Sequence, residues 1–182
     1  MADGILKVGT ITTSSGSGTI TLGQSGETIT IPSGATITNS GTANNFGGAN
    51  TPAFSVKSNG AKALANTTIT KLSFGTEVFD TDSAFASDKF TVPSGKDGKY
   101  FFYASWQTAT STDFNEQRIY IYKNGSAADP SIQGFHDHYG SIQISKILDL
   151  SATDYIEVYA YQNSGGSINT LNTEIFQGYK LI

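Results

Sequence analysis

The chain has 182 residues and a mass of 19.2 kDa, which is the size of one domain or of one domain with an appended segment. Only 14% of its residues are charged, compared with roughly 25% in an average soluble domain, and this argues against a helical bundle and against charge-driven disorder. The net charge of -4 disfavours a nucleic-acid-binding module, and the absence of cysteine excludes a disulfide framework and a thiolate zinc site.

The first ten residues, MADGILKVGT, contain no apolar run long enough for a signal peptide. No later segment approaches the ~18 apolar residues of a membrane span. We therefore expect a protein that is made in a cytoplasm and does not insert into a membrane. Ile5, Leu6 and Val8 lie in this short tail, which makes residues 1–10 a candidate anchoring peptide.

Residues 11–50 form a segment that is rich in Thr, Ser, Gly and Ile and has Glu27 as its only charged residue. Short β-branched runs recur in this segment, at residues 19–22, 28–31 and 35–38. Turn residues separate the runs, at residues 23–26 and 32–34. Because Ile or Leu alternates with Thr, each run is predicted to be a short strand with one apolar face.

Strands of three or four residues cannot bury an apolar face within one chain, since even a complete hairpin is marginal in water. Residues 11–50 therefore have two interpretations. One is a flexible linker. The other is an intertwined β-prism or β-helix, in which several chains supply equivalent strands around one axis. The regularly placed Ile residues favour the second, so we predict a β stalk that ends in a hinge at residues 39–51.

Residues 51–182 have the pattern of an antiparallel β domain. Strands are predicted at residues 90–92, 100–106, 118–122, 141–147, 155–161 and 174–182. Turn signals such as Asn124-Gly125 and Asp129-Pro130 lie between these strands. Strands at such spacing over ~130 residues indicate a sandwich or jelly roll, and no segment favours a helix.

The strand predicted at residues 100–106 is aromatic on both faces, with Tyr100 and Phe102 on one and Phe101 and Tyr103 on the other. A strand with two apolar faces needs a core on one side and a neighbouring subunit on the other. Tyrosine suits such an interface because its ring is buried while its hydroxyl finds a partner. The residues predicted for the interface are Tyr100, Phe102, Tyr103, Tyr159 and Tyr161.

Several motifs of the second half occur in a recognisable order. They are Ala53-Phe54-Ser55-Val56, Phe90-x-Val92-Pro93, Gly98-x-Tyr100-x-Phe102, Tyr122-Lys123-Asn124-Gly125 and Phe176-Gln177-Gly178-Tyr179. In this order they resemble the globular head of the complement C-one-q and tumour-necrosis-factor superfamily over residues 52–182. The chain departs from that pattern at Thr153, where the family usually has Gly before the Asp, and at Gln177 and Tyr179 in the closing motif.

The resemblance implies an all-β, ten-stranded jelly-roll sandwich that assembles as a tight homotrimer, so that the predicted interface becomes a trimer interface. Animal heads of this kind normally follow a collagen stalk and a secretory signal, whereas here the low-charge Thr/Ser/Gly/Ile repeat occupies the stalk position. Such repeats resemble segments of bacteriophage fibre and spike proteins. We therefore expect a virion protein with a virion-anchoring peptide at residues 1–10, a stalk at residues 11–50 and a knob at residues 51–182.

The expected function is attachment to a host surface by a trimeric tail or host-attachment fibre. The expected partners are further copies of the chain, other virion proteins at the N-terminus, and a host glycan or protein at the knob. Loops at residues 107–117 and 162–170 are candidates for this contact, because their amide side chains suit sugar hydroxyls. The alternative is a capsid decoration or head-fibre protein without a dedicated receptor. A secreted C-one-q-like ligand is disfavoured, because the N-terminus shows no export signal.

Two patterns could bind a metal ion. His136 and His138 place both imidazoles on one face of a strand, so that three copies could enclose one transition metal ion on a threefold axis. The alternative is a loop or edge strand whose histidines contact solvent or a neighbour. Asp80, Asp82 and Asp88 lack a complete calcium loop and are predicted to cap turns instead.

Catalysis finds little support in the sequence. There is no G-x-S-x-G elbow, and the two histidines have no evident nucleophile beside them. No pair of carboxylates stands out as a glycosidase pair, and no Gly-rich turn is followed by the Lys of a phosphate loop. We therefore predict that the protein is not an enzyme and needs no cofactor.

Overall fold

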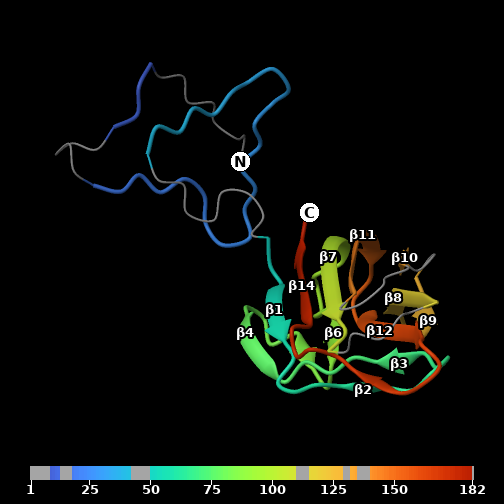
Figure 1. Ribbon diagram of the computed structural model, residues 1–182. Coiled ribbons are helices and arrows are strands. Elements are labelled where there is room, and N and C mark those ends of the chain that lie inside the picture. The colour runs from blue at the N-terminus through green and yellow to red at the C-terminus, as the bar shows by residue number, and fades with distance from the viewer. Residues whose placement is uncertain are drawn as a thin grey trace. The chain divides into compact units, whose positions relative to one another are not determined.

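A computed structural model gives the structure of the chain and describes residues 9–12, 18–41, 50–109, 115–128, 132–134 and 140–181 (Figure 1). The chain divides into two units, Met1–Asn44 and Asn45–Ile182. The residues described in both units are extended, turn or strand, and none of them is helical. Accordingly, no helix that could cross a membrane occurs in this part of the chain.

The first unit contains turns but no strand within residues 9–12 and 18–41, and each of these residues is exposed. One turn is closed by a hydrogen bond from the Glu27 amide to the Gln24 carbonyl at 3.0 Å, and the other by the Ala35 amide and the Pro32 carbonyl at 3.1 Å. Both turns lie where the sequence predicts them. The runs that flank the turns do not pair within one chain, so their pairing with further chains stays a prediction.

The second unit consists of antiparallel strands. The longer ones are β1 (Ala53–Lys57), β4 (Thr76–Asp80), β6 (Lys89–Thr91), β7 (Gly98–Gln107), β8 (Glu116–Lys123), β10 (Ile132–Gly134), β11 (Ser141–Leu150), β12 (Tyr155–Asn163) and β14 (Ile175–Lys180). The two-residue ones are β2 (Ala63–Leu64), β3 (Thr70–Lys71), β5 (Phe85–Ala86), β9 (Ser126–Ala127) and β13 (Ile168–Asn169). Each of the six predicted strands coincides with one of these.

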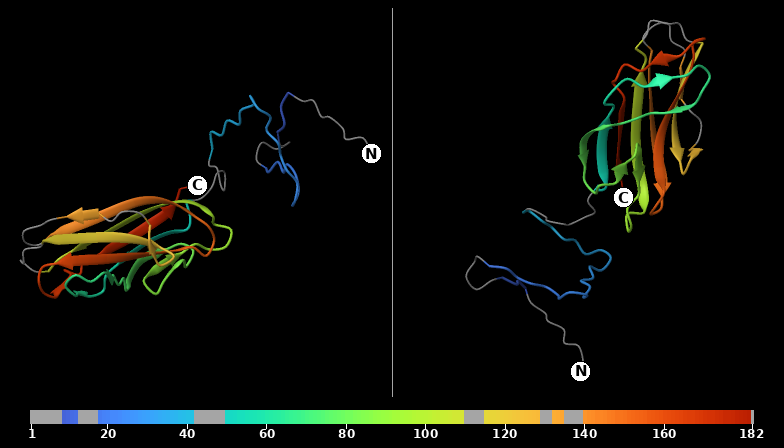
Figure 2. Two further views of the ribbon diagram at one scale, coloured as in Figure 1. Left: turned by 90° about the vertical axis from the view of Figure 1, so that its right-hand side faces the viewer. Right: turned by 90° about the horizontal axis from the view of Figure 1, so that it is seen from below.

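Two sheets pack face to face and form the sandwich (Figure 2). The five-stranded sheet has the order β11-β7-β14-β1-β4. The seven-stranded sheet has the order β10-β8-β12-β6-β5, with β3 added to β12 and β9 added to β8. A small third sheet joins β13 and β2. The predicted all-β jelly roll is therefore confirmed, although the described residues form nine longer strands and five two-residue strands rather than the ten strands that the resemblance implies.

The core lies between the two sheets and is rich in aromatic side chains. From β7 it receives Tyr100, Phe102, Ala104 and Trp106, each at most 1% exposed. The ring of Phe54, on β1, lies 4.9 Å from that of Phe90 and 4.9 Å from that of Phe176, between ring centroids. Alternate residues of the long strands thus fill the core, as the period of two requires.

Candidate functional site

The outer face of the five-stranded sheet, which points away from the core, carries an apolar row across four strands. Ile147 of β11 lies opposite Phe101 of β7, Phe101 lies opposite Tyr179 of β14, and Tyr179 lies opposite Ala53 of β1. Phe79 of β4 lies one level further along, opposite Ser55. We call Ala53, Phe79, Phe101, Ile147 and Tyr179 the apolar face.

Much of the apolar face is open to solvent in the single chain. Ile147 is 62% exposed, Phe79 is 47% exposed and Tyr179 is 40% exposed. The rings of Phe101 and Tyr179 contact each other, with 5.6 Å between their centroids. Large apolar side chains gathered on one face of a finished sandwich are typical of an interaction surface.

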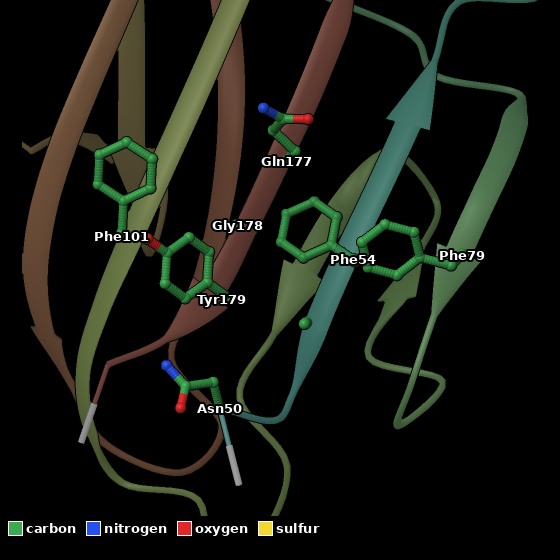
Figure 3. Close-up of a pocket in the computed structure, with 8 residues that line it drawn as sticks. Asn50, Phe54, Phe79, Phe101, Gln177, Gly178 and Tyr179 are labelled. Carbon is green, nitrogen blue, oxygen red and sulfur yellow. The ribbon is translucent and has the colours of Figure 1, made fainter.

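A pocket of about 430 Å³ is sunk into the apolar face. Phe79, Phe101 and Tyr179 line it together with the amides of Asn50 and Gln177 (Figure 3). Its lining offers rings and neutral amides and no charged group. Such a pocket can accept an apolar or aromatic side chain of another molecule, and the amides can satisfy a polar atom at its rim.

The outer face of the seven-stranded sheet carries a second aromatic group, Tyr120, Tyr122, Tyr155, Tyr159 and Tyr161, which we call the tyrosine face. The rings of Tyr122 and Tyr159 lie 4.1 Å apart between centroids. The Arg118 guanidinium lies 5.5 Å from the ring centroid of Tyr161, and the Lys89 ammonium lies 4.8 Å from that of Tyr155. These cations lie over ring faces, where the ring quadrupole attracts them.

Glu157, which lies among the tyrosines, is paired with Lys71 and with a tyrosine hydroxyl. Lys71 Nζ lies 2.7 Å from Glu157 Oε1, and the Tyr159 hydroxyl donates a hydrogen bond of 3.2 Å to Glu157 Oε2. Burial raises the pKa of the Tyr159 hydroxyl, and the negative charge of Glu157 raises it further. Glu157 therefore has both a cation and a hydroxyl as partners within the tyrosine face, whereas the apolar face is without cover in the single chain.

The structure does not bring the predicted interface residues together. Tyr100 and Phe102 are 0% exposed and fill the core of one chain, which corrects their assignment to an interface. Tyr103 lies on the outer side of the five-stranded sheet, where its hydroxyl donates to Gln143 Oε1 at 2.8 Å. Tyr159 and Tyr161 lie on the tyrosine face, so the core separates them from Tyr103. The alternation reveals two faces but not which of them points inward.

The apolar face also contains residues that sequence reasoning missed, above all Ile147 and Phe79. Phe101 and Tyr179 both fall within the ordered motifs of the second half. Their alternation with Phe102 and Gly178 was the signal in the sequence that could have placed them on the opposite face of their strands. The meeting of Ile147 with Phe101 depends on the register between β11 and β7. A register between strands forty residues apart cannot be taken from a single sequence.

The structure describes the predicted aspartate ligands but not the predicted histidine ligands. His136 and His138 lie outside the described residues. Within residues that the structure does describe, no group of three or more His, Asp or Glu side chains could hold a metal ion. The Asp80 carboxylate accepts hydrogen bonds from the amides of Ala84 at 3.0 Å and Phe85 at 2.8 Å, and Asp88 accepts one from the Phe74 amide at 2.7 Å. Asp80 and Asp88 thus hold loops in place, as the turn-cap alternative predicts.

The amide side chains of Gln162 and Asn66 hold the loop at residues 162–170 in place. Gln162 is 0% exposed, and its Nε2 donates to the carbonyls of Leu64 at 3.1 Å and Gly166 at 2.8 Å. Asn66 Oδ1 accepts from the Ser164 amide at 3.1 Å. Gln162 is therefore a scaffold for the loop rather than a contact for a partner. Residues 110–114 of the other candidate loop lie outside the described residues.

A second pocket, of about 300 Å³, lies where β1 ends and β14 begins, and the residues that line it include Lys57, Ser58, Asn172 and Glu174. Glu174 is 1% exposed, and both oxygens of its carboxyl group lack a hydrogen-bond partner, as does the Ser58 hydroxyl. Buried polar groups are usually hydrogen-bonded, so this pair is an exception within the described residues. Neither Ser58 nor Glu174 is predicted from the sequence as a site residue, because nothing in the local sequence pattern distinguishes them.

Two antiparallel sheets closed over an aromatic core define the fold as a jelly roll, and this fold is similar to that of C-one-q and tumour-necrosis-factor-type domains. The globular domain of zebrafish complement 1qA is similar at 18% identity and a TM-score of 0.52, over 72% of this chain and 98% of that one. Murine APRIL at pH 8.0 is similar at 13% identity and a TM-score of 0.53, over 71% of this chain and 98% of that one. No family model matches the sequence, and no curated protein sequence does so either. The likeness is thus one of fold, and it confirms the fold that the ordered motifs predict.

Proposed function

We propose that the chain is a homotrimeric, non-catalytic protein of a bacteriophage virion, whose knob attaches the particle to a host surface. The observation that carries this proposal is the apolar face. It presents Ile147, Phe79 and Tyr179 to solvent on a sandwich whose core is already complete. A second copy of the chain is the natural cover for such a surface, and the resemblance to the C-one-q and tumour-necrosis-factor head implies three copies.

A charge placed on the apolar face tests the trimer. The purified chain is expected to have about three times the mass of 19.2 kDa in light scattering. When the protein is diluted, Ile147→Asp should shift the mass toward that of one chain, because an unpaired buried carboxylate is costly. The matched control is Leu171→Asp, since Leu171 is also a half-exposed aliphatic residue, 42% exposed, but lies outside the apolar face. A wild-type monomer at micromolar concentration would contradict the proposal.

The N-terminal unit supports a virion protein. Glu27 is the only charge in the segment of Thr-Ile-Thr repeats that precedes the knob. This repeat resembles phage fibre segments, and residues 1–10 would then anchor the fibre to the particle. Three knobs on one fibre bind together, so that weak contacts to a host glycan or protein add up through multivalency. The tyrosine face lies on the other sheet of the sandwich, so covering the apolar face leaves it available for such contacts.

The two largest pKa shifts among the described residues have structural causes, which fits a non-catalytic role. Lys123 and Asn124 lower the pKa of Asp154 to about 2 within a pair of turns. Burial, with the negative charges of Asp82 and Asp97, raises the pKa of Tyr100 to about 12 in the core. Neither Asp154 nor Tyr100 lines either of the two pockets found among the described residues.

Binding to cells and to capsids separates the two candidate functions. If the knob attaches the virion, labelled protein should bind cells of the bacterial host, and an excess of unlabelled protein should block both this binding and infection. The alternative, a capsid decoration or head-fibre protein without a receptor, predicts binding to capsids that lack this protein and no binding to cells. The charge-poor repeat fits either location on the particle, so this measurement decides between them.

A further inference from the structure

The repeats of residues 18–41 leave a regular apolar stripe without cover. Ile20, Ile29 and Ile37 occupy the centre of each Thr-Ile-Thr unit, at intervals of nine and eight residues. Their side chains are 42%, 58% and 51% exposed. Leu22 and Ile31, two positions further along, are 63% and 46% exposed. A flexible linker does not need large aliphatic side chains at alternate positions, whereas a strand with one buried face does need them. The five such side chains therefore favour strands over a linker.

The corners between the repeats are already formed in the single chain. Gly26 and Gly34 have φ values of +88° and +84°, which L side chains rarely adopt, and each lies in a turn closed by a backbone hydrogen bond. The Glu27 carboxylate accepts a hydrogen bond of 2.7 Å from the Gln24 amide, which is a second hydrogen bond across the first turn. Turns thus alternate with extended runs at a period of eight to nine residues, and in the described segment these runs have no backbone hydrogen bonds to one another.

The charge pattern of the segment fits a partner of identical sequence. Copies that assemble around one axis bring identical residues close together, so every charge would face its own like charge. The segment has a single charge, on Glu27, and this carboxylate already accepts a hydrogen bond from the Gln24 amide within its turn. Thr alternates with Ile in each repeat and would place its hydroxyls on the outer side of an assembly, where water satisfies them.

From these features we infer that residues 18–41 of neighbouring copies interlock into a short intertwined β-prism. Ile20 with Leu22, Ile29 with Ile31, and Ile37 form three successive apolar layers along its axis. The turns around Gly26 and Gly34 form its corners. The partner is a second copy of this chain, and the inference rests on the proposed function only for the number of copies, which is three.

Hydrogen exchange of the full-length protein tests the prism with a matched pair of variants. One carries Ile20→Ser, Ile29→Ser and Ile37→Ser, and its control carries Thr21→Ser, Thr30→Ser and Thr38→Ser in the same repeats. In the wild type and the control, the amides of residues 18–41 should exchange about 100-fold or more slowly than in an unfolded chain. In the Ile variant they should exchange at the unfolded rate, while the amides of the knob keep their protection.

Two results would overturn the prism. Unfolded-chain exchange rates in the wild type would show a flexible linker. Protection that persists unchanged when the protein is diluted to a monomer would show that one chain folds the repeats alone.

A combined variant separates this inference from the trimeric knob. When Ile147→Asp disrupts the apolar face, residues 18–41 should remain protected and the copies should remain associated at high concentration. If instead the wild type is a trimer but residues 18–41 exchange freely, the prism is wrong and the trimeric knob stands. If the Ile147→Asp variant dissociates and loses the protection of residues 18–41 at every concentration tested, the prism does not form by itself, and the inference fails.

Discussion

Thr153 has a left-handed backbone, with φ of 74°, at the position where the resembled family usually has Gly. Its amide donates to the Val92 carbonyl at 2.9 Å, so the turn is tied to the neighbouring loop and cannot relax. A β-branched residue in this conformation is strained, because its side chain crowds the backbone. This chain thus has Thr where Gly is usual, but its backbone keeps the left-handed conformation that Gly would favour.

Thr153→Gly is therefore expected to stabilise the protein. The variant should raise the free energy of unfolding by about 1 kcal/mol, the left-handed penalty less the extra freedom of Gly in the unfolded chain. Chemical denaturation measures the change. Ala152→Gly serves as the control, since Ala152 does not have a positive φ and its replacement should lower the stability slightly. Equal effects of the two substitutions would contradict the argument.

Asp154, the next residue, links stability to pH. Its carboxylate pairs with Lys123 Nζ at 2.8 Å and accepts hydrogen bonds from Asn124 Nδ2 at 2.7 Å and the Ser151 amide at 2.9 Å. These contacts, with Lys123 first, lower the pKa of Asp154 from 3.8 to about 2 in the folded state. The unfolded chain therefore takes up this proton at a higher pH than the folded chain does.

The contribution of Asp154 should be complete above about pH 4 and lost as the pH falls toward 2, since a lowered folded-state pKa favours the folded state only while the group is ionised. It amounts to at most about 2 kcal/mol. Urea denaturation of the wild type and of Asp154→Asn between pH 2 and pH 6 checks this. The stability difference between the two should shrink as the pH falls, and a constant difference would contradict the prediction.

Strands β14 and β7 approach each other closely at Gly178. A Cβ atom at Gly178 would lie 2.5 Å from Phe102 Cδ1 and 2.8 Å from the Phe101 carbonyl oxygen. The closing motif therefore needs Gly at this position, because a side chain would collide with a core ring and with the backbone of the neighbouring strand. Gly178 faces the core directly beneath the apolar face formed by its neighbour Tyr179.

Gly178→Ala should destabilise the sandwich by about 1–3 kcal/mol, the usual cost of forcing an extra methyl group into a packed core. Thermal unfolding should show a lower midpoint. Gly60→Ala provides the comparison, since a Cβ atom at Gly60 would meet nothing within 4 Å. A midpoint that falls as far in Gly60→Ala as in Gly178→Ala would mean that backbone entropy, rather than the contact with Phe102, causes the loss.

The strands were predictable because their signal is local, and their arrangement was not because it depends on register. Alternation and turn residues predicted β7, β8, β11 and β12, and the Asn124-Gly125 turn has the positive φ values, 51° and 79°, that its sequence favours. The two-residue strands have too few residues for any alternation to show. Whether Phe101 or Phe102 of β7 points into the core depends on which other strands pack against each face, and the local sequence does not reveal this.

The knob should assemble without the N-terminal unit, because the apolar face lies entirely within residues 51–182. A chain that lacks residues 1–49, and so keeps the pocket residue Asn50, is expected to form a trimer. Its thermal unfolding should be a single transition whose midpoint rises with protein concentration, since association stabilises the folded state by mass action. Light scattering and calorimetry at several concentrations measure both. A monomer with a midpoint independent of concentration would contradict the prediction.

At the scale of the whole molecule, the ordered motifs predicted the fold correctly, although each motif is short. Phe54, Phe90, Phe102 and Phe176 belong to four different motifs and meet in one aromatic core, which explains why their order is informative. The trimer, the stalk and the virion remain predictions, because they concern contacts between chains. No property of one chain's core determines how many copies cover its outer surface.

Strand β11 ends the five-stranded sheet and is ten residues long, so it presents an open row of backbone groups to any passing strand. Lys146 lies in the middle of this strand, on the same side as the buried Ile144 and opposite Phe102 of β7. A foreign strand that added to this edge would have to enclose an ammonium group together with its own side chains. An inward-pointing charge on an edge strand disfavours strand addition, so we expect that many copies can be crowded together without the sheet growing from one molecule into the next as in an amyloid-like fibril.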